Sequence, residues 1–192
     1  MILVIDNYDS FVETLARYAR ELGFETRVCR NDGISVEDAL SNRPSHIILS
    51  PGPGRPEEAG IMMALVEASP TIPILGVCLG HQGLCSHYGG DTIFAPEPMH
   101  GRASDIFHEG DALFAGVPSP FAAGRYHSLL GVPAADGLLE TIAWGADGTP
   151  MAVRHRRLPH VGVQFHPESI LTPAGRHVMD NFLKQTASRG SA

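Results

Sequence analysis

The first half of the chain alternates short apolar runs with stretches in which apolar residues recur at helical spacing. The apolar runs predict strands at residues 2–5, 46–49 and 73–77, the last of them buried, and residues 24–30 are interpreted as a further strand. Apolar positions three or four residues apart predict a helix over residues 11–22, capped by Asp9 or Ser10 and closed by Gly23. Ser35 is a good N-cap for a short helix over residues 35–40. Strands that alternate with helices over short loops favour a largely parallel sheet covered on both faces.

The second half of the chain has a different pattern. A helix that begins near His81 ends at Gly89-Gly90, after which Gly and Pro separate short strand-like runs and predict an antiparallel or mixed arrangement. These runs are residues 92–95, 104–107, 124–127, 138–143, 151–154 and 160–164. A closing helix is predicted over residues 172–186, with Pro173 at an early position, and the tail 187–192 is expected to be frayed or disordered.

The composition is that of an ordinary soluble globular protein, with 43% hydrophobic and 18% charged residues. The 192 residues show no internal repeat or low-complexity linker, so we expect one domain spanning residues 1–192. The net charge of −7 argues against nucleic acid or an anionic membrane as the main partner. The basic run at residues 154–157 is interpreted as a solvated strand end rather than a phosphate site.

The absence of recognisable targeting signals and the pattern of cysteines predict a cytoplasmic location. The apolar run at the start of the chain is too short for a signal peptide and has no basic leader, and no stretch of about 18 apolar residues indicates a membrane span. The three cysteines are odd in number and show no paired spacing, so a disulfide framework is not expected.

Cys78 lies where a predicted strand meets a predicted helix, in the pattern Gly76-Val77-Cys78-Leu79-Gly80. This is the thiol counterpart of a nucleophile elbow, in which small neighbours let a strained turn project the reactive side chain above the sheet. The amides and the dipole at the start of the following helix favour the thiolate over the thiol. The alternative interpretation is a buried structural cysteine beside a tight turn.

A cysteine nucleophile needs a base, and the base needs an orienting carboxylate. His166 follows an apolar strand, Pro167 holds it extended, and Glu168 lies two positions further on, where it shares a face with His166. The His-x-Glu motif is weak by itself. It gains value from its position at the carboxyl end of a strand, where catalytic groups gather in open α/β sheets.

The loop Ser50-Pro51-Gly52-Pro53-Gly54 also follows a predicted strand. Glycines let the backbone come close to a ligand, and prolines fix the loop. The amide of Gly52 can pair with that of Leu79 to bind a developing oxyanion. The alternative interpretation, which holds for most such loops, is a rigid turn that binds no ligand. A phosphate-binding loop is excluded, because no Gly-Lys-Ser/Thr follows.

Other reactive side chains carry weaker signals. His81 is a possible second base but is expected to pack or to cap its helix, and Cys85, two helical turns after Cys78, is expected in the core. The remaining histidines considered show no shared metal-ligand spacing, so we expect no metal and no cofactor. They are His87, His100, His108, His127, His155 and His160.

Six motifs stand in a fixed order along the chain. They are Asp6-Asn7-Tyr8-Asp9-Ser10-Phe11, Ser50-Pro51-Gly52-Pro53-Gly54, Gly76-Val77-Cys78-Leu79-Gly80-His81-Gln82, Met99-His100-Gly101, Arg125-Tyr126-His127-Ser128-Leu129 and Gly162-Val163-Gln164-Phe165-His166-Pro167-Glu168-Ser169. Together they resemble the class I, triad-type glutamine amidotransferases, over residues 1–183. Within that family the sequence is most similar to the small subunits of anthranilate synthase and 4-amino-4-deoxychorismate synthase.

The resemblance implies a flavodoxin-like, three-layer α/β/α fold with a largely parallel, mixed central sheet, and a glutaminase activity. In such an enzyme Cys78 attacks the side-chain amide of L-glutamine, His166 shuttles the proton and Glu168 orients His166. The remaining implied site residues bind glutamine or form the oxyanion hole. They are Gly52, Pro53, Gly54, Leu79, Gln82, Ser128 and Leu129.

The resemblance also implies a partner, the large subunit of a chorismate-utilising synthase, in a heterodimer or heterotetramer. Residues 8–10 and 99–101 resemble the regions that meet this subunit, which receives the ammonia. Two positions depart from the family pattern: Val12 replaces a threonine, and Arg102 replaces a lysine, which keeps the charge but changes the hydrogen-bond geometry. Anthranilate, aminodeoxychorismate and secondary-metabolite pathways all stay open, because that chemistry belongs to the other subunit.

Two other function classes compete with this interpretation. One is a stand-alone thiol hydrolase of γ-glutamyl amides or peptides, which needs no partner. The other is a non-catalytic, flavodoxin-like partner-binding module with a vestigial site.

Overall fold

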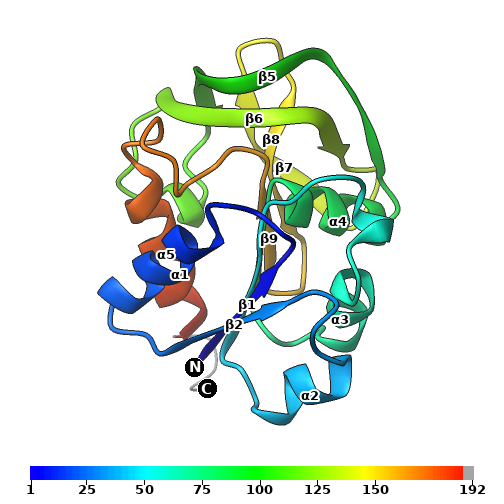
Figure 1. Ribbon diagram of the computed structural model, residues 1–192. Helices are drawn as coiled ribbons and strands as arrows, with labels where there is room; N and C mark the ends of the chain where they lie inside the picture. Colours follow the sequence, from blue (N-terminus) through cyan, green and yellow to red (C-terminus); the bar gives the residue numbers. More distant parts are fainter. Residues whose placement is uncertain (188–192) are drawn as a thin grey trace.

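The computed structural model describes residues 1–187 and is built on one nine-stranded sheet, in the order β2-β1-β3-β4-β9-β8-β7-β5-β6. The strands are β1 (Ile2–Asp6), β2 (Thr26–Arg30), β3 (His46–Leu49), β4 (Ile74–Val77), β5 (Asp91–His108), β6 (Phe121–Val132), β7 (Leu139–Gly145), β8 (Pro150–His155) and β9 (His160–Val163). The pairs from β2 to β9 are parallel, and those from β9 to β6 are antiparallel. The change of pattern along the sequence therefore corresponds to a change of strand direction across the sheet (Figure 1).

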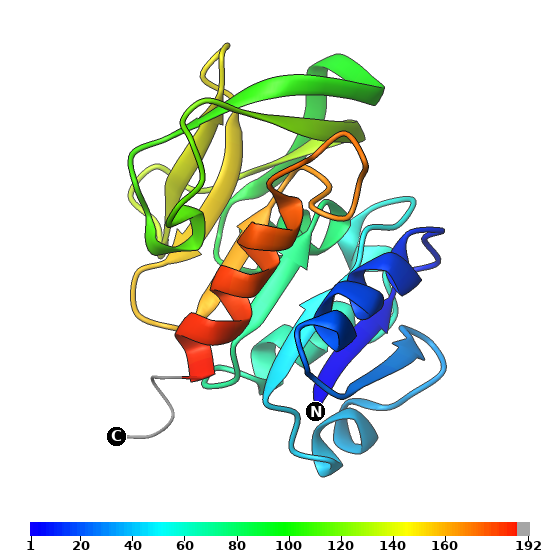
Figure 2. The same cartoon turned by 90° about the vertical axis from the view of Figure 1, so that its left-hand side faces the viewer.

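Helices cover both faces of the parallel half, as the alternation of strands and helices predicts. The helices are α1 (Val12–Glu21), α2 (Val36–Ser41), α3 (Met62–Ala68), α4 (Leu79–His87) and α5 (Gly175–Ala187). α1 and α5 lie side by side on one face (Figure 2), and α2, α3 and α4 lie on the other (Figure 1).

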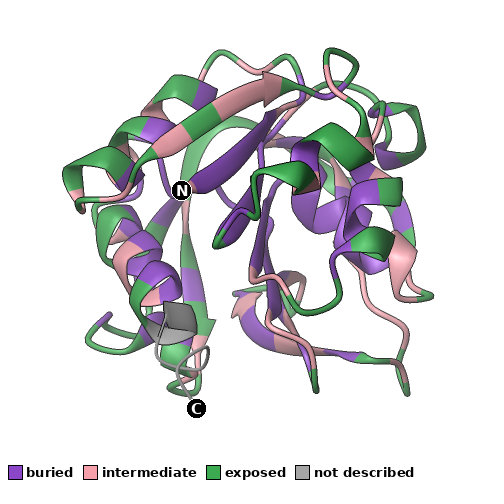
Figure 3. Cartoon of the chain, turned by 90° about the horizontal axis from the view of Figure 1, so that it is seen from below, coloured by how far each residue is buried: buried purple, intermediate pink, exposed green. Residues whose placement is uncertain are grey.

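Residues of β1 point alternately into two hydrophobic clusters, one on each face. Ile2 and Val4 pack in the cluster that contains Leu15 of α1, whereas Leu3 and Ile5 pack in the cluster that contains Leu65 of α3. Each of these β1 side chains is at most 1% exposed. Figure 3 shows the same division, with buried strands between helices whose outer faces are exposed. This burial on both faces explains why β1, β3 and β4 read as apolar runs, whereas β2, none of whose residues is buried, does not.

Helix α3 and the short 3₁₀ turn η1 (Pro56–Glu58) are absent from the sequence-based prediction. α3 has only seven residues, and Ile61 at its N-cap makes no side-chain capping bond. The usual sequence signals of a helix start are therefore missing.

Several predicted boundaries are wrong in the second half. The runs at 92–95 and 104–107 belong to the single strand β5, whose register shifts between Phe94 and Met99 absorb the prolines that interrupt the pattern. β6 extends well beyond the predicted 124–127, because it pairs with β5 along almost its whole length. α5 begins at Gly175 rather than residue 172, so Pro173 precedes the helix.

The ends of α1 and α5 also differ from expectation. α1 begins at Val12, and Asp9 Oδ1 accepts a hydrogen bond from the Phe11 amide at 2.7 Å, so Asp9 acts before the cap position. Ala187 of the expected frayed tail still belongs to α5, and residues 188–192 lie outside the described residues.

The basic run is only partly solvated. Arg154 pairs with Asp111 at 2.7 Å and His155 is buried, whereas Arg156 and Arg157 are exposed as predicted. Cys85 is fully buried beside Leu139 and Val153, which confirms its place in the core. Within residues 1–187 no helix is both long enough and apolar enough to span a membrane.

Candidate active site

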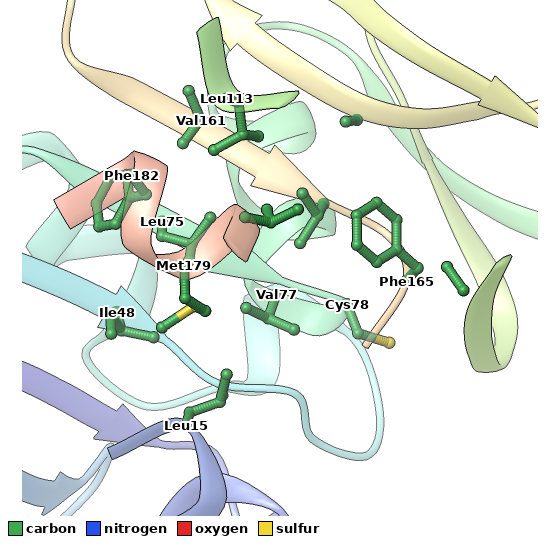
Figure 4. Close-up of a cluster of buried hydrophobic side chains, with 14 of the residues drawn as sticks. Leu15, Ile48, Leu75, Val77, Cys78, Leu113, Val161, Phe165, Met179 and Phe182 are labelled. Carbon is green, nitrogen blue, oxygen red and sulfur yellow. The ribbon is translucent and has the colours of Figure 1, made fainter. Parts of the chain in front are cut away.

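Cys78 sits on a sharp, strained turn between β4 and α4. Its backbone has φ 50° and ψ −97°, a left-handed φ that residues other than glycine rarely adopt. The turn is possible because its neighbours are small: a Cβ atom on Gly76 would lie 2.5 Å from the carbonyl carbon of Gly80, and one on Gly80 would lie 2.7 Å from Leu49 Cβ. Cys78 is 5% exposed, and its sulfur points away from the core cluster (Figure 4). This is the geometry of a nucleophile elbow.

His166 is held rigidly just beyond the end of β9. Its amide donates to the Gly124 carbonyl at 2.9 Å, and its own carbonyl accepts a hydrogen bond from Thr172 Oγ1 at 2.6 Å. The rings of Tyr126 and Phe11 stand edge-on to the imidazole, with centroid distances of 4.9 and 6.2 Å. These contacts leave the imidazole one orientation.

Glu168 completes the local pair, as their spacing of two residues predicts. His166 Nδ1 and Glu168 Oε1 are 2.5 Å apart, and both side chains are buried. Burial alone would lower the pKa of His166, but the neighbouring Cys78 sulfur and the Glu168 carboxylate outweigh it and raise that pKa to about 10. Nε2 is buried and, among the described residues, has no hydrogen-bond partner of ordinary length, so it is available to a reacting group.

The glycine-rich loop after β3 is anchored to the end of β1. The Asn7 amide donates to Ser50 Oγ, and Asn7 Nδ2 donates to the Ser50 carbonyl, both at 2.8 Å. A Cβ atom on Gly52 would overlap the Asn7 carbonyl and lie 3.0 Å from Leu79 Cδ2. Gly52 is therefore required by close approach, and the fold brings it against Leu79. Leu79 is the first residue of α4, so its N–H has no acceptor in a preceding helical turn.

A cavity of about 350 Å³ opens over Cys78. Of the predicted substrate-binding residues all except Leu79 line it: Gly52, Pro53, Gly54, Gln82, Ser128 and Leu129. Gln82 Nε2 donates to the Leu129 carbonyl at 3.0 Å, which leaves the Gln82 carbonyl oxygen free to accept. The volume lies within the range of ordinary small-molecule sites.

The cavity is also lined by five residues for which the sequence predicted no substrate-binding role: Arg55, Phe94, His100, Tyr126 and His127. Tyr126 and His127 belong to the motif that contains Ser128, so their motif was a usable signal. No sequence signal indicates that Arg55 lines the cavity, because its position depends on hydrogen bonds of 3.1 and 3.0 Å to the Thr92 carbonyl of β5.

Two other buried histidines lie near the cavity but stay neutral. Burial, together with the charge of Arg125, lowers the pKa of His127 to about 3, and Arg125 Nε donates to His127 Nε2 at 3.0 Å. Of the two places expected for His81, the structure shows packing in the core, with Nε2 3.3 Å from the Gly131 carbonyl, and burial lowers its pKa to about 4. His166 thus differs from both in carrying a raised pKa and a carboxylate partner.

Comparison with known proteins identifies the family. The family model described as "Glutamine amidotransferase class-I" matches residues 3–186. The chain belongs to this family. It is 48% identical over 189 residues to "Anthranilate synthase component 2" of Azospirillum brasilense, with 97% of this chain and 96% of that protein covered. It is 46% identical over 186 residues to "Aminodeoxychorismate/anthranilate synthase component 2" of Bacillus subtilis, with 96% of each chain covered.

Two solved structures have the same fold. The crystal structure of a putative GMP synthase subunit from Thermoplasma acidophilum superposes with a TM-score of 0.88 at 27% identity, covering 98% of this chain and 94% of that one. A glutamine amidotransferase from Thermotoga maritima superposes with a TM-score of 0.78 at 16% identity, covering 98% and 96%. The expected flavodoxin-like α/β/α architecture is confirmed, with a mixed sheet whose strands from β2 to β9 are parallel.

Proposed function

We propose that this chain is the glutaminase subunit of a chorismate-aminating synthase. It hydrolyses L-glutamine to glutamate and passes the ammonia to a large synthase subunit. One observation carries the proposal: a cysteine on a strained elbow lies beside a buried His166–Glu168 pair and lines a cavity together with most of the residues that the resemblance assigns to glutamine binding. The near full-length similarity to component 2 proteins supports the choice of synthase.

In the first half of the reaction, the Cys78 sulfur attacks the side-chain amide carbon of glutamine and a C–S bond forms. The negative charge that develops on the carbonyl oxygen is received by the N–H groups of Gly52 and Leu79. Protonated His166 gives its Nε2 proton to the leaving nitrogen, the C–N bond breaks, and ammonia departs. The products of this step are ammonia and a γ-glutamyl thioester on Cys78.

In the second half, neutral His166 takes a proton from water, which attacks the thioester carbon. The C–S bond breaks, glutamate leaves, and the thiolate and the imidazolium are restored. Glu168 accepts the hydrogen bond from Nδ1 throughout, so it fixes the ring and stabilises its charged form. Gln82, Ser128 and Leu129, with Pro53 and Gly54, hold the glutamine in place.

The large subunit is expected to dock at the mouth of the cavity, over residues 8–10 and 99–101. Tyr8, which is 50% exposed, and Phe94, which is 80% exposed, support this placement, because large apolar side chains left open to solvent mark contact sites. We propose that residues 1–192 act as one domain in the cytoplasm, within a heterodimer or heterotetramer.

The test is reconstitution with the large subunit, with Cys78→Ser compared to Cys29→Ser. Cys29 is a half-buried cysteine of β2 outside the cavity, so its variant is the matched control. Cys78→Ser should lose glutamine-dependent amination of chorismate by about 10⁴-fold and keep ammonia-dependent amination. Equal loss of both activities would contradict the role of Cys78.

The same preparation separates the other two function classes. Full turnover of γ-glutamyl amides without the synthase subunit, with tolerance of large groups on the amide nitrogen, would indicate a stand-alone hydrolase. Failure of a reactive glutamine analogue to label Cys78, even with the synthase present, would indicate a non-catalytic module. Identification of the aminated product then decides between anthranilate and aminodeoxychorismate.

A further inference from the structure

Gln164 is a fully buried polar residue to which the mechanism above gives no role. It follows β9 directly and lies two residues before His166. Its side chain is 0% exposed, and burying an amide in an apolar interior is costly unless its donor and acceptor are both used. The partners of this amide therefore indicate what it does.

The strand register carries Gln164 to the nucleophile. β4 and β9 pair in parallel with Val77 opposite Val163, and the Cys78 amide donates to the Val163 carbonyl at 2.9 Å. Cys78 and Gln164 are thus the next residues on two adjacent strands. Gln164 Nε2 lies 3.6 Å from Cys78 Sγ, within the length of a hydrogen bond to sulfur.

The orientation of the amide is determined by its other end. Gln164 Oε1 lies 2.9 Å from the backbone nitrogen of Gly131 in β6. A backbone N–H can only donate, so the oxygen must face Gly131 and the NH₂ group must face the sulfur. Gly131 cannot move away easily, because a Cβ atom there would already lie 2.9 Å from His81 Cδ2 and 3.0 Å from Cys85 Sγ.

We propose that Gln164 is a hydrogen-bond donor to the Cys78 thiolate, which it stabilises both as nucleophile and as leaving group. This inference rests on the proposed glutaminase chemistry for its purpose, but the contact itself does not. A hydrogen bond to an ionised acceptor is about twice as strong as one to a neutral acceptor, so the amide favours the thiolate over the thiol and over the thioester. It acts when the sulfur attacks and again when the thioester is hydrolysed.

The competing role is structural: Gln164 only fastens β9 to β6, which carries Ser128 and Leu129 of the cavity wall. Two variants separate the roles. Gln164→Met keeps a similar volume and removes both hydrogen bonds. In Gln164→Glu one carboxyl oxygen still accepts from Gly131 N–H, and at pH values where the carboxyl group is ionised it has no donor for the sulfur and repels its charge.

The experiment measures the rate at which iodoacetamide alkylates Cys78 in the full-length chain as a function of pH, with each labelled cysteine identified by mass spectrometry. Cys29 in the same sample is the internal control, and thermal melting checks that each variant is folded. Gln164→Met should shift the midpoint of the Cys78 profile to higher pH and lower the rate at pH 7 about tenfold. Gln164→Glu should shift it at least as far, while the Cys29 profile stays the same in all three proteins.

A Cys78 midpoint that is unchanged in both folded variants overturns the inference and leaves Gln164 as a strand anchor. If Gln164→Met fails to fold, Gln164→Glu, which keeps the Gly131 bond, decides alone. Because alkylation requires neither glutamine nor the synthase subunit, this result is independent of whether glutaminase activity is found. In an active preparation, kcat/KM for glutamine should fall about tenfold in Gln164→Met.

Discussion

The inner strands of the parallel half and strand β5 of the antiparallel half differ sharply in burial. Every residue of β3, β4 and β9 is buried, whereas most of β5 is exposed. The parallel half carries Cys78 and His166 at adjacent strand ends, and the antiparallel half supplies Tyr126 to Leu129 of the cavity wall. The proposed reacting groups thus follow strands that are buried on both faces, whereas the proposed ligand-contacting groups lie on β6, where buried and exposed residues alternate beside the mostly exposed β5. Four predictions, which use six substitutions, test this division.

The largest expected effect separates two buried histidines, one from each half. His166→Ala should lower kcat/KM for glutamine about 10⁴-fold through kcat, because it removes the proton shuttle. His127→Ala should act mainly on KM, by about tenfold, because neutral His127 lines the cavity without a carboxylate partner. Steady-state kinetics of the reconstituted complex measures both. An equal loss of kcat in the two variants would contradict the division between the halves.

The next effect concerns how tightly the parallel half is packed. Gly52→Ala should lower the free energy of unfolding by about 3 kcal/mol, because the new Cβ would overlap the Asn7 carbonyl. The matched control is Gly148→Ala, in the turn between β7 and β8. A Cβ atom at Gly148 would meet nothing within 4 Å, so only the left-handed φ of 80° should lower the free energy of unfolding, by about 1 kcal/mol. Urea denaturation compares the two. Similar losses would mean that the loop shifts to accommodate the new Cβ and that close approach to Asn7 does not require a glycine at position 52.

A smaller effect with a defined pH dependence is expected for Glu168→Gln. The folded pKa of His166, about 10, lies above its ordinary 6.5, so its interactions contribute stability that is full below pH 6.5 and lost as the pH rises through 10. The variant should therefore be less stable than the wild type near pH 6, by about 1 to 2 kcal/mol, with the difference shrinking towards pH 10. Its kcat/KM should fall about tenfold.

Denaturation curves at several pH values, together with NMR titration of the His166 ring, check this prediction. The ring should titrate at lower pH in Glu168→Gln than in the wild type. A stability difference that stays constant from pH 6 to pH 10 would show that the carboxylate acts only through packing.

The smallest effect on the fold is expected at the exposed rim of the antiparallel half. Phe94→Ala should change the free energy of unfolding by less than about 0.5 kcal/mol, because Phe94 is 80% exposed. It should nevertheless weaken association with the large subunit, which isothermal titration calorimetry can measure. A loss of stability above about 1 kcal/mol, with association unchanged, would place Phe94 in the core rather than at the contact surface.

The sequence predicted the parallel half better than the antiparallel half, for a physical reason. Strands buried on both faces read as uninterrupted apolar runs, so residues 2–5 and 46–49 were located to within a residue. β5 is exposed and contains Pro96, Pro98 and a register shift, so its local pattern resembles two strands. Helix α3 was missed because it is short and lacks a capping side chain.

By itself, the sequence determined the elbow at Cys78, the His166–Glu168 spacing and the glycine loop, because each depends on neighbours within a few residues. Only the tertiary structure decided that Gln164, 86 positions further along the chain, returns to the Cys78 sulfur, that His81 is buried in the core and that Arg55 reaches the cavity. Those placements depend on the register of β4 against β9 and on packing between distant segments, and no local pattern of residues encodes either.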